Sequence, residues 1–164
     1  MTAEPRERGA TIGPMANAPG SFVAEPARAH DLETALELLR RVDLPEKGVV
    51  EHFGLFHVVR DDGRVVALAG LEVHGEDGLL RSVAVDPAYR GQGLAASLVG
   101  ASLGLAAKVG LREVYLLTTT ARDYFLRRGF ADCPREDAPA GIRESWEFRT
   151  GCPSTSAFMR RRLP

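Results

Sequence analysis

Residues 83–95, VAVDPAYRGQGLA, decide the fold of this chain. The apolar, β-branched start is typical of a buried strand, and the Asp-Pro pair at 86–87 ends it because proline cannot continue a hydrogen-bonded ladder. Arg90, Gly91 and Gly93 follow, and then a segment rich in alanine and leucine that is typical of a helix. Unpaired amides at a helix N-terminus attract an anion. The stretch therefore predicts a strand, a loop that cradles phosphate, and a helix.

This loop is neither of the two better-known phosphate-binding motifs. Leu94 and Ala95 stand where a P-loop has lysine and Ser or Thr, and no Gly-x-Gly-x-x-Gly can be read here. The order Arg-x-x-Gly-x-Ala, after a strand that ends Val-x-Val-x-Pro, resembles instead the acetyl-CoA signature of the GNAT superfamily of N-acetyltransferases. Residues 121–130, ARDYFLRRGF, resemble the helix and closing Gly-Phe of the same superfamily. The resemblance covers the chain from about residue 22 to the C-terminus.

The resemblance implies an α/β (α+β) domain with a central, mixed, mostly antiparallel and splayed sheet that is flanked by helices. It implies acetyl-CoA as co-substrate, with the diphosphate on the loop amides and the pantetheine arm along the strand. The expected cofactor-binding residues are Val83, Ala84, Val85, Arg90, Gly91, Gln92, Gly93, Leu94, Ala95 and Phe125.

Length and composition indicate one domain with an ordinary core. We expect residues 21–164 to form the GNAT domain and residues 1–20, which have almost no large apolar side chains, to be a disordered leader in which Met15 is an alternative start. The net charge of −1 argues against nucleic acid and membrane surfaces as partners. No apolar run is long enough to span a bilayer, so we expect a cytoplasmic protein. The four histidines and two cysteines show no metal-ligand spacing, and no metal is expected.

Periodicity and turn signals predict the other elements. An apolar stripe after Asp31 predicts a helix. A long helix between strands 79–85 and 113–118 requires them to pair in parallel, because the chain must cross over. The remaining predictions are an extended segment at 22–26, a short helix at 49–56, strands at 56–60 and 64–73, helices at 93–109 and 124–128, and a last hairpin of 143–148 with 156–161.

The second motif departs from the commonest pattern of the superfamily. Many members have an asparagine where this chain has Thr118, and a tyrosine that acts as general acid where it has Phe125. Tyr124 lies one residue earlier, about 100° around a helix, and cannot simply replace that tyrosine. A non-catalytic acyl-CoA-binding sensor therefore stays open as an alternative to an enzyme.

The same departure resembles one branch of the superfamily. Residues 117–121, LTTTA, and the tail with Glu147-Phe148 and Cys152-Pro153 resemble the N-acetylglutamate synthase-like branch, and within it the arsenic-resistance N-acetyltransferases. The resemblance implies direct acetyl transfer to a small, amino-acid-like amine, with an arsenical amino acid as one candidate. It leaves the oligomeric state open, including a homodimer.

An acetyl transfer to an amino acid needs a group that takes the amine proton and a cation for the carboxylate. Glu72 is the candidate proton acceptor, because it alternates with His74 on one face of a strand. Arg81, two residues from Val83 and hence expected on its face, is the candidate carboxylate ligand, although an ion-paired arginine is equally consistent. The other candidates are Thr118 and Tyr124 for catalysis and Thr119 and Arg143 for the substrate, with helix capping as the alternative for the threonines.

Overall fold

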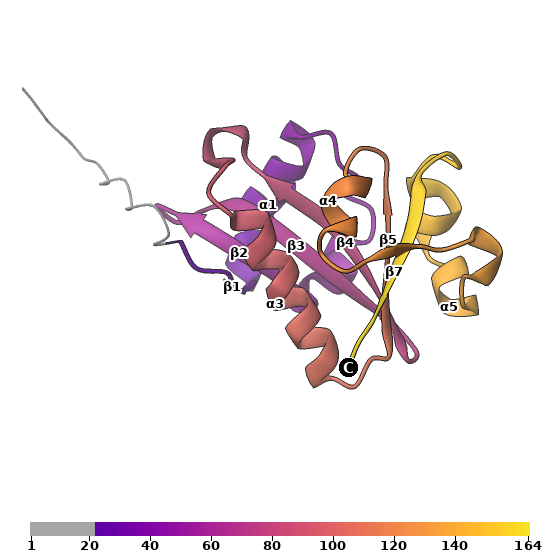
Figure 1. Ribbon diagram of the computed structural model, residues 1–164. Coiled ribbons are helices and arrows are strands. Elements are labelled where there is room, and N and C mark those ends of the chain that lie inside the picture. The colour runs from indigo at the N-terminus through magenta and orange to yellow at the C-terminus, as the bar shows by residue number, and fades with distance from the viewer. Residues whose placement is uncertain (1–21) are drawn as a thin grey trace, which may run out of the picture.

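A seven-stranded sheet forms the centre of the protein (Figure 1). The structure is a computed structural model that describes residues 22–164, so the predicted leader lies outside the described residues. The strand order is β1-β2-β3-β4-β5-β7-β6, in which β4 pairs with β5 in parallel and the other neighbours are antiparallel. The strands are Glu25–Pro26 (β1), Phe56–Asp61 (β2), Arg64–His74 (β3), Asp77–Val85 (β4), Glu113–Thr118 (β5), Ala131–Asp132 (β6) and Ala157–Arg162 (β7).

Helices cover both faces of the sheet, as the mixed α/β prediction requires. Figure 1 shows α3 running across the front of the sheet. Residues of α1 and α2 pack together in a separate core cluster on the opposite face. The α-helices are Leu32–Arg41 (α1), Val49–His52 (α2), Leu94–Lys108 (α3), Arg122–Leu126 (α4) and Ala140–Arg143 (α5). Short 3-10 turns lie at Ala29–Asp31 (η2), Phe53–Leu55 (η3), Pro87–Tyr89 (η4) and Arg135–Asp137 (η5), and a π-helical turn at Glu147–Gly151 (η6).

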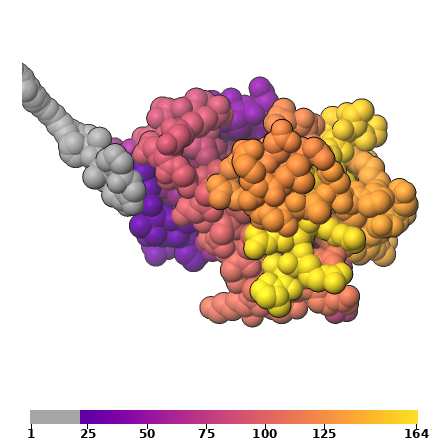
Figure 2. Space-filling view, viewed as in Figure 1, coloured from indigo at the N-terminus to yellow at the C-terminus, as the bar shows by residue number. Residues whose placement is uncertain are grey.

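The alternation of side chains along β3 divides the core into two layers. Ala67, Ala69 and Leu71 pack against α3, in one cluster with Leu94 and Leu98. On the opposite face, Leu68 of β3 packs in a second cluster with residues of α1, α2 and the neighbouring strands. These residues include Leu38, Val49, Phe56 and Ala84. A third cluster joins Ile142 of α5 to three residues of the sheet, Leu79, Tyr115 and Phe158. In the space-filling view, the segment around α4 lies beside the C-terminal strand on the front of the molecule (Figure 2). None of the helices in residues 22–164 has the length and apolarity needed to cross a bilayer.

The predicted last hairpin is wrong in its first arm. Residues 143–148 continue from α5 into η6, because Ser145 bonds back to Ile142 and the amide of Arg149 bonds to the carbonyl of Ser145. β7 pairs with β5, in a register that sets Leu116 opposite Met159, and with β6 on its other side.

The sheet opens between β4 and β5. Their pairing extends from Asp77 opposite Glu113 only to Leu79 opposite Tyr115, after which the two strands diverge. β4 also has a bulge: Arg81 lies opposite Gly70, but Ala84 lies opposite Leu68. Three residues of β4 thus match two of β3, and Ser82 takes a positive φ of 57°. The bulge and the divergence produce the predicted splayed sheet.

Gly70 is a close-packing position whose substitution tests the α1 face of the core. A Cβ at Gly70 would overlap with the ring of Phe56, which is fully buried. We expect Gly70→Ala to lower the free energy of unfolding by about 1–3 kcal/mol, as overpacking does. Gly100→Ala, on the exposed side of α3 with open space around it, should instead raise it by about 0.5–1 kcal/mol. Urea denaturation measures both, and an unchanged stability of Gly70→Ala would contradict the described packing.

Candidate active site

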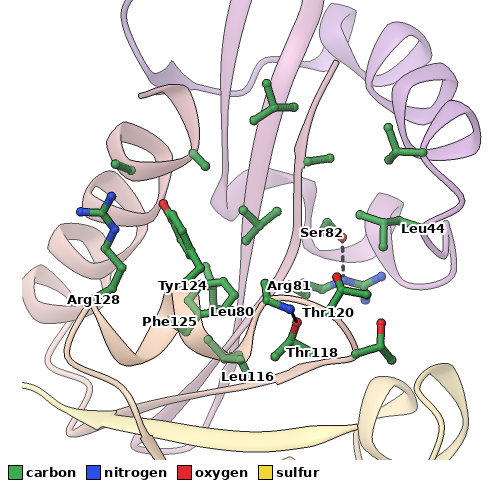
Figure 3. A pocket seen from close by; sticks show the side chains of 18 of the residues that line it. Leu44, Leu80, Arg81, Ser82, Leu116, Thr118, Thr120, Tyr124, Phe125 and Arg128 are labelled. Atoms are coloured by element: carbon green, nitrogen blue, oxygen red, sulfur yellow. Dashed lines mark hydrogen bonds between the residues drawn. The ribbon is translucent and has the colours of Figure 1, made fainter. Parts of the chain in front are cut away.

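A cleft of about 860 Å³ occupies the opening between β4 and β5. It crosses the sheet, with the N-terminus of α3 and α4 on one side and the loop between α1 and α2 on the other (Figure 3). Most of the residues singled out from the sequence line this one cleft: Arg81, Val83, Ala84, Val85, Arg90, Gly91, Gly93, Leu94, Ala95, Thr118, Thr119, Tyr124 and Phe125. Gln92, Glu72 and Arg143 do not line it.

The α3 side of the cleft has the geometry of an anion cradle. η4 is capped by Asp86, which accepts from the amide of Ala88 at 2.9 Å. Gly91 and Gly93 then take positive φ angles of 82° and 78°, which favour glycine, and α3 starts without a side-chain cap. Within residues 22–164, the amides of residues 91–96 donate to no protein acceptor. These amides and the helix dipole are therefore available to a phosphate.

Two aromatic residues of α4 complete this side. Phe125 is buried, with its ring centroid 5.2 Å from that of Tyr124 and 5.6 Å from that of Phe130. The hydroxyl of Tyr124 is buried and has no hydrogen-bond partner among the described residues. Figure 3 shows Tyr124 pointing along the cleft. The guanidinium carbon of Arg128 lies 4.9 Å from the centroid of the Tyr124 ring, in a cation–π contact. An unpartnered buried hydroxyl is costly, and a polar ligand in the cleft would satisfy it.

The opposite side, which we call the α1 side, is organised around Arg81. Its Nη1 donates to Glu72 at 2.6 Å, and its Nη2 donates to the carbonyl of Lys47 at 2.6 Å and lies 3.2 Å from Glu147. Nε donates to the hydroxyl of Ser82 at 3.1 Å. The Arg81 side chain is only 1 % exposed. The ion-paired alternative is thus realised at the base of the cleft.

Arg81 does not lie on the face of Val83, contrary to the prediction. The bulge at Ser82 shifts the alternation by one residue, so Arg81 shares its face with Ala84 and faces α2, next to Glu72. Glu72 and His74 do share a face, and His74 Nε2 lies 2.8 Å from the Glu72 carboxylate. Burial opposes ionisation of Glu72, but the hydrogen bonds from His74 and Arg81 outweigh it and hold the pKa of this carboxyl below its usual value.

The remaining candidates have other partners. Thr118 accepts a hydrogen bond from the amide of Ala121 at 3.0 Å, and so caps the start of α4 while it lines the cleft. Arg143 is exposed and donates to the carbonyls of Glu136 and Ala138, outside the cleft. Gln92 donates to the carbonyl of Tyr89 at 3.3 Å.

Sequence reasoning missed Glu147 and Cys152 as residues of the cleft. Both line it, from η6 and the residue after it, and the Cys152 thiol donates to Glu147 at 3.3 Å. Burial first, and then the Glu147 charge, raises the pKa of Cys152 to about 12. The tail signature contained both residues, but the incorrect hairpin gave no reason to place them at the site. Within residues 22–164, no group of three or more His, Cys, Asp or Glu side chains is arranged to hold a metal ion.

Comparison with known proteins decides the family. The model of the acetyltransferase (GNAT) family matches residues 23–130. The chain belongs to the GNAT acetyltransferase family. This confirms the family and the fold expected from the sequence, and acetyl-CoA as the family's co-substrate.

Relatives of the GNAT chain are longer proteins. The amino-acid acetyltransferase of Azotobacter vinelandii is 31% identical over 134 residues, which cover 75% of this chain and 31% of that protein. The amino-acid acetyltransferase of Aeromonas salmonicida is 29% identical over 143 residues, which cover 77% of this chain and 32% of that protein. The chain therefore spans about a third of the length of the curated relatives it matches.

Two solved structures share the fold. N-acetylglutamate synthase from Neisseria gonorrhoeae, complexed with coenzyme A and N-acetyl-glutamate, has a TM-score of 0.77 at 20% identity and covers 95% of this chain and 37% of its own. Rv2747 from Mycobacterium tuberculosis, in complex with CoA and NLQ, has a TM-score of 0.74 at 26% identity. The match covers 87% of this chain and 99% of the Rv2747 chain.

The residues of this GNAT chain fit the cofactor. A diphosphate is anionic, and the unpaired amides of residues 91–96 form an anion site. The cleft follows the free edge of β4 past Leu79, and the unpartnered hydroxyl of Tyr124 lies beside it. Val83, Val85, Gly91, Gly93 and Leu94 would hold acetyl-CoA in this arrangement.

The glycines of the cradle provide a direct test. Gly91→Glu or Gly93→Glu places a negative side chain at the anion site, at positions with open space and a positive φ. We expect either variant to weaken CoA binding at least a hundredfold in isothermal titration calorimetry. Gly110→Glu is the matched control, because Gly110 has the same kind of backbone, at φ 86°, beyond the other end of α3. Unchanged affinity in both cradle variants would remove the diphosphate from this loop.

Proposed function

We propose that this protein is an acetyl-CoA-dependent N-acetyltransferase that acts on a small, amino-acid-like amine by direct transfer. One observation carries the proposal: a single cleft across the open sheet joins the anion cradle of α3 to the polar cluster around Arg81. A donor held on one side can thus meet an acceptor held on the other. The names of the relatives, amino-acid acetyltransferase, support the same class of acceptor.

On the donor side, the chain would orient the cofactor with its backbone. Acetyl-CoA supplies the acetyl group as an activated thioester. The amides at the start of α3 would hold the diphosphate, and the free edge of β4 at Val83 and Val85 would hold the arm, which would direct the thioester into the cleft. Thr118 accepts from the Ala121 amide, which leaves its own hydroxyl proton to donate into the cleft. Thr118 and Tyr124 are therefore the hydroxyls we propose at the leaving sulfur.

On the acceptor side, Arg81 remains the proposed carboxylate ligand together with Thr119. Its Nη1 has a second hydrogen beyond the one given to Glu72, and Arg81 lines the cleft. Glu72 lies behind Arg81 and does not line the cleft, and its pKa is lowered. We therefore propose that Glu72 positions Arg81 and receives the amine proton only through intervening groups.

The proposal also includes a specific acceptor and a cellular compartment. An arsenical amino acid is the specific candidate that the LTTTA run and the tail suggest, and the cytoplasm is the compartment that the sequence suggests. An acceptor panel that contains common amino acids, simple amines and an arsenical amino acid tests the first of these.

Release of free thiol from acetyl-CoA tests the proposed activity. With purified protein and the acceptor panel, we expect turnover on at least one amino acid and much less on amines that lack a carboxylate. Mass spectrometry of the product should show one acetyl group on nitrogen. Tight CoA binding without turnover on any amine would instead favour an acyl-CoA-binding sensor.

Phe125→Tyr tests the position where many relatives have a tyrosine. Because Phe125 lines the cleft, an added hydroxyl provides a proton donor near the leaving thiolate. We expect kcat to stay within about threefold of the parent or to rise. Phe130→Tyr, which buries a hydroxyl outside the cleft, should lower the melting temperature with no gain in kcat. A collapse of kcat in a stably folded Phe125→Tyr would show that the site needs an apolar wall here.

Cys152 tests whether the transfer is direct. Because its pKa is raised to about 12, we expect its thiol to react with iodoacetamide at pH 8 at least a hundredfold more slowly than free cysteine. Cys152→Ser should retain most of the turnover. Rapid labelling, together with loss of activity in Cys152→Ser, would point to an acetyl-cysteine intermediate.

A further inference from the structure

We propose that the acceptor pocket excludes a second negative charge, so that the acceptor is an α-amino acid without an acidic side chain, and that Glu147 sets this preference. The inference rests on the proposed function. We define the acceptor pocket as the α1 side of the cleft: Leu44, Arg81, Ser82, Thr118, Thr119, Thr120, Glu147 and Cys152.

The pocket lining has one positive and one negative side chain, Arg81 and Glu147, and a second carboxylate lies behind them. Among its lining residues Arg81 is the cation. All three nitrogens of its guanidinium already donate to protein acceptors. The carboxylates of Glu72 and Glu147 both lie against it, at 2.6 and 3.2 Å. The Cys152 thiol is neutral because its pKa is about 12. Arg81 is thus shared between two carboxylates, Glu147 in the lining and Glu72 behind it, and no second cation is among the residues that define the pocket.

The other cations that line the cleft belong to its α3 side. Arg90 donates to the carbonyl of Val85 next to the cradle. Arg127 and Arg128 follow α4, and Figure 3 shows Arg128 across the cleft from Arg81, stacked on Tyr124. These three arginines line the side of the cleft that we propose for the cofactor. One acceptor carboxylate can share Arg81, but a second finds no unpaired cation among the described residues of the pocket.

Glu147 is the carboxylate of the pocket lining. Glu72 and Arg81 form the shorter pair, and Glu72 also interacts with His74 at 2.8 Å. Glu147 lies farther from Arg81, accepts a hydrogen bond from a neutral thiol, and lines the cleft itself. Its charge therefore faces the acceptor, where it attracts the ammonium group and repels an acidic side chain. An arsenical amino acid with an uncharged arsenic group meets the same condition.

Two isosteric pairs of amino acids measure the preference. We would determine kcat/KM at pH 8, above the ordinary titration range of an imidazole, for glutamine against glutamate and asparagine against aspartate. For a compound that is not turned over, its inhibition constant against the best amino acid replaces KM. We expect the amide to be favoured at least tenfold, mainly through KM or the inhibition constant, because charge affects binding in the pocket.

Variants of Glu147 separate charge from structure. Glu147→Gln removes the negative side chain from the pocket lining and should reduce the amide preference about tenfold, whereas Glu147→Asp keeps the charge and should keep the preference. Glu144→Gln, on the exposed surface outside the cleft, makes the same change of net charge and should have no effect. Melting temperatures show whether each variant is folded. If Glu147→Gln is unfolded, the test is whether folded Glu147→Asp keeps the amide preference.

The outcomes distinguish this inference from the function on which it rests. Equal use of glutamate and glutamine, a preference that survives in Glu147→Gln, or its loss in folded Glu147→Asp would overturn the inference while amino-acid acetylation stands. Acetyl-CoA binding without acetylation of any amino acid would overturn the proposed function, and the inference with it.

Discussion

The divergence of β4 from β5 after Leu79 is the constraint on which the rest of the site depends. A parallel pair that continued would fill this space with backbone hydrogen bonds and leave no passage between the two faces. The bulge at Ser82 holds a non-glycine residue at φ 57°, a conformation that costs of order 1 kcal/mol or more. The fold thus accepts local strain and an unpaired strand edge at the point where donor and acceptor are proposed to meet.

The two sides of this opening solve different electrostatic problems. On the α3 side, backbone amides stay unpaired, and the start of the helix provides partial positive charge without a side chain. On the α1 side, buried charges are almost fully paired with one another, because an isolated charge there would be strongly destabilising. An anionic cofactor and a cationic amine are each matched by the side that they would occupy.

The sequence predicted what depends on local signals and failed where distant contacts decide. The strand, glycine loop and helix of residues 83–95 are encoded within one short segment, so the cradle could be predicted in detail. The face of the sheet on which Arg81 lies could not be predicted, because the bulge depends on the register of β4 with β3. Glu147 was missed because residues 143–148 were predicted to be one arm of the last hairpin, while contacts with α5 and Gly151 favour a turn. Glu72 was placed on the correct face, but its burial behind Arg81 depends on the α1–α2 loop.

Titration of the ¹⁵N-labelled protein with CoA, followed by amide chemical shifts, tests the central claim most directly. The account predicts that the largest shifts fall on the amides of residues 91–96 and on Val83 and Val85, with smaller ones at Thr118 and Tyr124. The amides of α5 and β1 should not move. Largest shifts outside the cleft between β4 and β5, or no saturable shifts in the cradle, would contradict the account.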